Sequence, residues 1–134
     1  MTESHRTTVA VINGFADTIE MLRITLENAG YATVEAQAHD VRTGAVDLAE
    51  FVRRHGVAVV LYDVAIPYEQ NWRFVHGIRA GALRSVPFVV TTTNKGVLHQ
   101  LVGPTDAIEI IGKPYDLNLL VEAVHRAVAS VTRQ

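Results

Sequence analysis

Three side chains with chemically useful groups come at the ends of short apolar runs. Asp63, Thr92 and Lys113 each lie directly after, or just beyond, such a run. A carboxylate can act as a nucleophile in phosphoryl transfer. If the runs are parallel strands, their C-terminal ends share one edge of a sheet, where ligands and reactive groups collect. The sequence therefore predicts a polar site around Asp63 at that edge.

The elements that must position these side chains alternate between strand-like and helix-like segments. The predicted strands are Thr8–Ile12, Ala32–Glu35, Val57–Tyr62, Val86–Val90 and Ala107–Ile111. Helical periodicity predicts a helix in each of the stretches Phe15–Ala29, Val41–Gly56, Asn71–Ala80, Lys95–Val102 and Leu117–Val128. Nearly continuous apolar runs suit strands that are covered on both faces. The alternation therefore predicts a three-layer α/β fold, with a parallel sheet between helices and right-handed crossovers.

Composition narrows the class of protein further. The chain has 134 residues, which suits a single domain over residues 1–134 with its core at about 8–131. It has no cysteine, which fits a reducing cytoplasm, and a net charge of -2 without a basic stripe, which argues against direct nucleic-acid binding. The polar N-terminus and the absence of a long apolar run predict neither a signal peptide nor a membrane span.

The chain resembles the receiver domain of bacterial two-component response regulators. The resemblance covers roughly Thr8 to Val131 and rests on three motifs in the family's order. These are D-V-A-I-P starting at Asp63, the hydroxyl Thr92 five residues after a proline, and the Lys113-Pro114 pair followed by an aromatic residue and a helix. The resemblance implies the flavodoxin-like (βα)5 fold, a doubly wound sheet with strand order 2-1-3-4-5.

The resemblance also implies a role for each matching residue. Asp63 is implied to receive a phosphoryl group from a sensor histidine kinase or a phosphotransfer protein. Thr92 and Lys113 are implied to contact that group, and the bond between Lys113 and Pro114 is implied to be cis. Partners, or a second copy of the chain, are implied to bind the face formed by Lys95–Val102, the fifth strand and the C-terminal helix.

The chain departs from the family after its first strand. Typical receivers have two acidic residues there to hold Mg²⁺, whereas this chain has Asn13 and Gly14. Because Mg²⁺ favours carboxylates, we expect at most weak binding through Asp63 and the amide oxygen of Asn13. The strand position where the family usually has an aromatic switch residue is occupied by Ile110, and the loop after Pro67 carries Tyr68 and Trp72.

Several residues also have ordinary structural interpretations. Asp63 can end a strand, Thr92 can end a strand or cap a helix, and Lys113 can form a fixed ion pair with Asp63. Tyr68 and Trp72 can serve either in packing or as a partner-binding hot spot.

Three functions follow from these alternatives. The first is a stand-alone receiver, without an output domain, that accepts a phosphoryl group on Asp63 and signals by protein contact. The second is a pseudo-receiver that binds proteins without phosphorylation, which the pair Asn13 and Gly14 favours. The third is a small flavodoxin-like enzyme or cofactor carrier, because fold does not determine function. The sequence has no nucleophile–base pair and no phosphate-binding glycine motif, so we expect no enzyme activity.

Overall fold

The computed structural model describes residues 6–103 and 108–132, so the N-terminal residues 1–5 and Ala107 of the predicted fifth strand lie outside it. In chain order the elements are β1 (Thr8–Asn13), α1 (Ala16–Asn28), β2 (Ala32–Gln37), α2 (Ala38–Thr43), α3 (Leu48–His55), β3 (Val57–Asp63), α4 (Tyr68–Ala80), β4 (Phe88–Thr92), α5 (Lys95–Val102), β5 (Ile108–Gly112) and α6 (Leu117–Thr132). The strands form one parallel sheet in the order β2-β1-β3-β4-β5, which confirms the predicted fold class and strand order.

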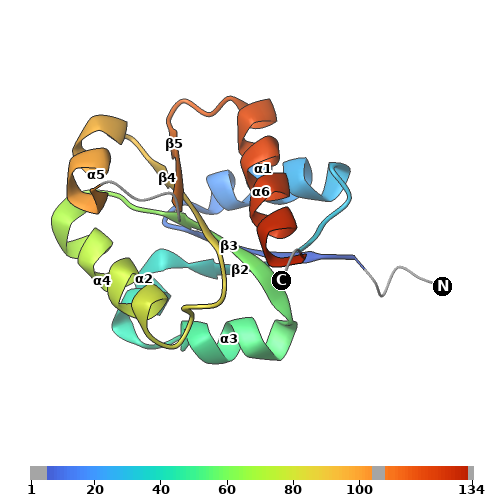
Figure 1. The fold of residues 1–134 in the computed structure, drawn as a ribbon, viewed down its shortest axis with the longest axis horizontal. Coiled ribbons are helices and arrows are strands. Elements are labelled where there is room, and N and C mark those ends of the chain that lie inside the picture. The colour runs from blue at the N-terminus through green and yellow to red at the C-terminus, as the bar shows by residue number, and fades with distance from the viewer. Residues whose placement is uncertain (1–5, 104–107, 133–134) are drawn as a thin grey trace.

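Two hydrophobic cores lie on opposite faces of the sheet (Figure 1). Helices α1 and α6 cover one face, where they pack on Val9, Val11, Val59, Leu61 and Val89. Helices α2 to α5 cover the other face, where they pack on the alternate residues of the same strands. Because successive side chains of a strand point to opposite faces, strands β1, β3 and β4 need apolar residues at consecutive positions. This explains their unbroken apolar runs.

The predicted helix between Val41 and Gly56 is wrong in one respect, because two helices occupy this region. Helix α2 ends at Thr43, and Gly44 follows with a left-handed φ of 87°, a conformation that suits glycine. Helix α3 then begins after Asp47, whose side chain accepts a hydrogen bond from the backbone N of Glu50 at 3.2 Å. A turn and a new N-cap therefore interrupt a stretch whose apolar spacing suggested one helix.

Other boundaries differ from the predictions too, among them the starts of two elements. Helix α4 begins at Tyr68 rather than at Asn71. Strand β4 begins at Phe88 rather than at Val86, because Pro87 has no N–H group to donate to a neighbouring strand. The carbonyl of Pro87 still accepts a hydrogen bond from the backbone N of Val60 at 3.0 Å. None of the helices in the described ranges is long and apolar enough to cross a membrane.

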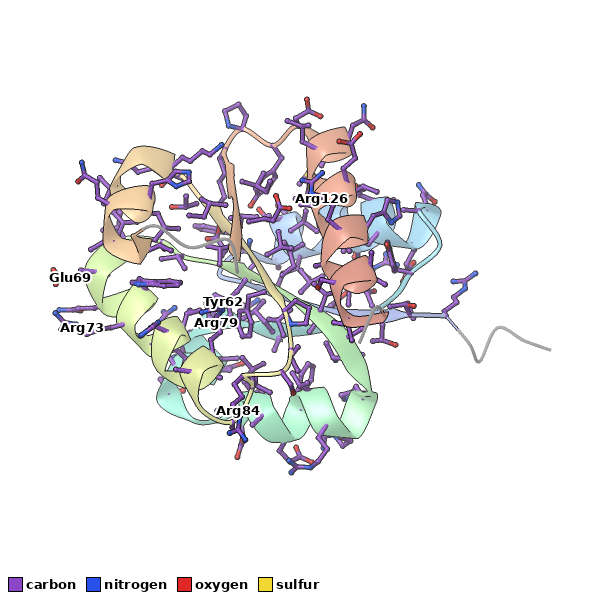
Figure 2. All side chains as sticks on the ribbon, in the orientation of Figure 1. Tyr62, Glu69, Arg73, Arg79, Arg84 and Arg126 are labelled. Atoms are coloured by element: carbon purple, nitrogen blue, oxygen red, sulfur yellow. The ribbon has the colours of Figure 1, made fainter. Side chains whose placement is uncertain are left out.

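Tyr62 is a polar residue inside the core that α2 to α5 cover. Its side chain is 1% exposed, and its hydroxyl has no hydrogen-bond partner among the described residues. In Figure 2 it lies in the interior, whereas the ion-paired Glu69 and Arg73 lie at the outer surface. Burial raises the pKa of Tyr62 to about 12. The phenol is therefore neutral in the folded protein, and its unsatisfied hydroxyl lowers the stability of the fold.

Replacing Tyr62 with phenylalanine is expected to stabilise the protein by about 1–2 kcal/mol at neutral pH, because it removes an unsatisfied buried hydroxyl. In the unchanged protein the unfolded tyrosine ionises near pH 10 and the folded one at about 12, so stability falls as the pH rises between these values. Tyr62→Phe should remove that loss, up to about 3 kcal/mol. Urea unfolding at pH 7 and pH 11 measures both effects.

A matched control for this change is Tyr31→Phe. The hydroxyl of Tyr31 is hydrogen-bonded to Nδ1 of His125, so its removal is expected to destabilise the protein at pH 7. Equal destabilisation by Tyr62→Phe and Tyr31→Phe would contradict the assignment of Tyr62 as an unsatisfied group.

Candidate functional site

The C-terminal edge of the sheet carries a buried carboxylate. Asp63 is the last residue of β3 and is 5% exposed. Its Oδ1 atom accepts a hydrogen bond from Oγ1 of Thr91 at 2.6 Å, and Nζ of Lys113 lies 3.2 Å from the same oxygen. Two donors thus converge on one oxygen of the carboxylate. Such charge-assisted contacts are stronger than hydrogen bonds between neutral groups.

Lys113 reaches Asp63 from the segment that follows β5. Its backbone N donates to the carbonyl of Thr92 at 2.9 Å, and its side chain is 20% exposed. Burial by itself lowers the pKa of Lys113, but the negative charge of Asp63 and the hydroxyl of Tyr115 outweigh burial, so the pKa is raised. The peptide bond between Lys113 and Pro114 is cis, as is the bond between Ile66 and Pro67, which the sequence analysis did not foresee.

The structure brings Thr91, rather than the predicted Thr92, to the carboxylate. Thr91 is the register partner of Asp63, and partners in parallel strands point to the same face of the sheet. Thr92 therefore points to the opposite face, where it is fully buried and its Oγ1 accepts from the backbone N of Asn94 at 3.3 Å. The spacing after Pro87 predicted Thr92 as the hydroxyl near the carboxylate. Only the pairing of β3 with β4 shows that the hydroxyl of Thr91 lies there instead.

Tyr115 is a site residue that the sequence analysis noted only as an aromatic residue after Pro114. Its hydroxyl donates to Oγ1 of Thr91 at 3.4 Å. Nζ of Lys113 also lies 5.6 Å from the centre of the Tyr115 ring and 6.0 Å from that of Phe15, within the range of cation–π attraction. A polar aromatic residue two positions after the lysine was the available signal.

Asn13 is the last residue of β1, and Gly14 follows it at the same edge of the sheet as Asp63. Asn13 is 1% exposed, and its Oδ1 accepts from the backbone N of Phe15 at 3.1 Å. Its Nδ2 has no hydrogen-bond partner among the described residues. Gly14 has no side chain, and apart from its neighbours in the chain no heavy atom lies within 4 Å of where its Cβ would be.

These residues do not fit a divalent cation. Mg²⁺ needs several oxygen ligands, with carboxylates preferred. The one carboxylate at the site, Asp63, is already paired with Lys113, and the amide oxygen of Asn13 is used by the backbone. Within residues 6–103 and 108–132, no cluster of three histidine, aspartate or glutamate side chains has a geometry suited to a metal.

Side chains at the start of α4 hold the loop that joins this helix to β3. The hydroxyls of Tyr68 and Thr93 are 2.6 Å apart, and Nδ2 of Asn71 donates to the carbonyl of Ala65 at 2.9 Å. Trp72 is 7% exposed and belongs to the core, which is the packing alternative for this residue. Ile66, by contrast, is 74% exposed.

Solved structures with a similar fold include proteins described as receivers. The chain is similar to a response regulator receiver protein from Sinorhizobium medicae WSM419, with a TM-score of 0.71, 18% identity, and coverage of 96% of this chain and 98% of that one. It is also similar to the signal receiver domain of an HD domain-containing protein from Pseudomonas fluorescens Pf-5, with a TM-score of 0.76, 14% identity and coverage of 97% and 100%.

The chain has the fold of a receiver domain. A third receiver fold, the chemotaxis response regulator CheY4 of Vibrio cholerae, is 24% identical with a TM-score of 0.68 and coverage of 91% and 98%. No protein-family model matches the sequence, and comparison with curated proteins gives no significant match. In this receiver fold, Asp63 ends the central strand of the sheet, between β1 and β4.

Proposed function

We propose that the protein is a receiver-type signalling module of a two-component phosphorelay, with Asp63 at the phosphoacceptor position. The observation that carries the proposal is the buried carboxylate of Asp63 at the end of β3, 3.2 Å from Nζ of Lys113. A lysine at this distance can neutralise charge that a phosphoryl group brings to the carboxylate. The receiver fold supports the same function, and we propose a signalling module rather than an enzyme.

The chemistry we propose uses the other oxygen of Asp63. Thr91 and Lys113 both contact Oδ1. A bond forms between Oδ2 and the phosphorus of a phosphohistidine on a kinase or phosphotransfer protein. The P–N bond breaks as it forms, and the imidazole leaves with its electron pair and takes up a proton. Because the residues present do not fit Mg²⁺, Lys113 is the group that we expect to balance the added charge.

The signal would leave the molecule through protein contact. We propose that α5, β5 and α6 form the face for a downstream partner or for a second copy of the chain. A stand-alone protein of this kind would act in the cytoplasm, where kinases and phosphotransfer proteins meet it. Neither a nucleic acid nor a membrane is part of this proposal.

Incubation with a small phosphodonor, followed by intact-mass measurement, tests the proposal. The unchanged protein is expected to gain one phosphate, and Asp63→Asn is expected to gain none. Asp17→Asn is a suitable control, since Asp17 lies exposed on α1 and outside the proposed chemistry. The absence of any gain, with the small donor and with phosphotransfer proteins alike, would refute the role of Asp63 as acceptor.

The second candidate is a pseudo-receiver that binds partners without phosphorylation. The backbone contact of Asn13, the missing side chain at Gly14 and the Asp63–Lys113 ion pair favour it, because they leave no divalent-cation site and hold the carboxylate in one state. A Mg²⁺ titration followed by Trp72 fluorescence tests whether the divalent-cation site is absent, as this candidate requires, and the phosphodonor experiment distinguishes the two candidates. Saturable binding at low concentration would argue against the pseudo-receiver.

A further inference from the structure

Thr91 links Asp63 to Tyr115 through a single hydroxyl. That hydroxyl has one proton, which it donates to Oδ1 of Asp63 at 2.6 Å. Its oxygen accepts from the hydroxyl of Tyr115 at 3.4 Å. The direction of the chain is therefore set as Tyr115 to Thr91 to Asp63. Hydrogen bonds in such a series polarise one another, so each depends on the next.

Tyr115 contacts both of the groups that hold the carboxylate. Its hydroxyl reaches Thr91, and its ring lies 5.6 Å from Nζ of Lys113. Thr91 is 1% exposed, so solvent has little access to this residue. The side chain of Ile110, on β5, has no hydroxyl that can contribute. The segment between β5 and α6 thus supplies a hydroxyl that the strand lacks.

We propose that Tyr115, acting through Thr91, is the positioning residue for the Asp63 carboxylate. The Tyr115–Thr91 pair and Lys113 hold Oδ1 from two sides and orient Oδ2 for reaction. The effect on reaction rate rests on the proposed function of Asp63, whereas the link between the three side chains does not. A change of charge at Asp63 therefore alters the environment of Tyr115, in the loop that leads into α6.

The experiment compares two deletions with two matched controls. Thr91→Val and Tyr115→Phe each remove a hydroxyl and keep the size of the side chain. Thr33→Val is the control for Thr91→Val. Thr33 lies on strand β2, and its Oγ1 also donates a hydrogen bond to a carboxylate, that of Glu27. Tyr31→Phe is the control for Tyr115→Phe, since it also removes a hydrogen-bonded tyrosine hydroxyl. Thr91→Ser restores the hydroxyl and tests for rescue.

The first measurement needs no phosphorylation. The ¹H–¹³C signals of the Tyr115 ring are compared with and without the change Asp63→Asn, in each background. We expect a shift in the unchanged protein, a smaller shift in Thr91→Val, where Lys113 alone still joins Asp63 to Tyr115, and a return to the full shift in Thr91→Ser. The same shift in Thr91→Val as in the unchanged protein would overturn the proposal. The proposal would also be overturned if the shift of the Tyr115 signals were lost in Thr92→Val but retained in Thr91→Val.

The second measurement is the rate at which a phosphodonor modifies the protein. We expect Thr91→Val to slow it about tenfold and Tyr115→Phe about threefold, as hydrogen bonds to charged and neutral groups suggest. Thr33→Val and Tyr31→Phe should leave it unchanged. Phosphorylation at the unchanged rate in both deletion variants would overturn the positioning role. If the unchanged protein takes up no phosphate, the proposed function fails and the Tyr115 signals alone decide the link.

Discussion

Replacing Asn13 and Gly14 together with aspartate is expected to create a Mg²⁺ site beside Asp63. The double variant should bind Mg²⁺ on the order of 100-fold more tightly than the unchanged protein, since two carboxylates add the charge and the oxygen ligands that are missing. The space is available, because a Cβ at Gly14 has no other atom within 4 Å and the backbone there is not left-handed. Isothermal titration calorimetry measures the affinity directly.

The control for this change adds the same two charges elsewhere. Asn28 and Gln100 are exposed on α1 and α5, so Asn28→Asp with Gln100→Glu alters the net charge without touching the site. This control should bind Mg²⁺ no better than the unchanged protein. The same weak binding in both double variants would mean that Asn13 and Gly14 are not the positions that limit the site.

Replacing Lys113 with methionine is expected to destabilise the protein by about 2–3 kcal/mol, because it leaves the buried carboxylate of Asp63 without its cation. Methionine keeps most of the length and the apolar character of the lysine stem, and it removes only the charged Nζ, which lies near the rings of Phe15 and Tyr115. The loss should shrink in the double variant Asp63→Asn, Lys113→Met, which has no charge left to compensate. Urea unfolding of the two single variants and the double variant yields the coupling energy.

A surface ion pair provides the contrast. Arg126, which is labelled beside α6 in Figure 2, forms two hydrogen bonds with Glu109 at 2.6 and 2.9 Å, but its side chain is 57% exposed. Exposed pairs contribute little to stability, so Arg126→Met should have a smaller effect than Lys113→Met. Equal losses of unfolding free energy in Arg126→Met and Lys113→Met would show that the buried pair contributes no more to stability than the exposed one. Strictly additive effects of Asp63→Asn and Lys113→Met would show the same.

The pH dependence of this pair has a definite sign. The pKa of Lys113 is raised in the folded protein, so its contribution is complete below the pKa of an unfolded lysine, near 10.4. That contribution is lost as the pH rises through the raised pKa. Asp63→Asn should abolish this alkaline loss. The comparison is best made in the Tyr62→Phe background, because Tyr62 titrates in the same range.

Much of the fold was predictable because its signals are local. Apolar runs at β1, β3 and β4, helical spacing in α1 and α6, and glycine after α1 each depend on neighbours in the sequence. The break between α2 and α3 was harder to predict, since Gly44 and Asp47 compete with an apolar spacing that continues through both helices. Because Asp63 and Lys113 each follow a predicted parallel strand, the sequence alone also predicted that both lie at the C-terminal edge of the sheet.

The partners of Asp63 within the site could be settled only by the tertiary structure. By itself, the sequence determined the α/β class, the carboxylate at the end of β3 and the lysine beyond β5, because strand ends and polarity follow from local pattern. It did not determine whether Thr91 or Thr92 meets the carboxylate, since that depends on the register of two strands joined through α4. Nor did it show that Tyr115 reaches Thr91, because that contact spans 24 residues and forms only when β5 is in place beside β4.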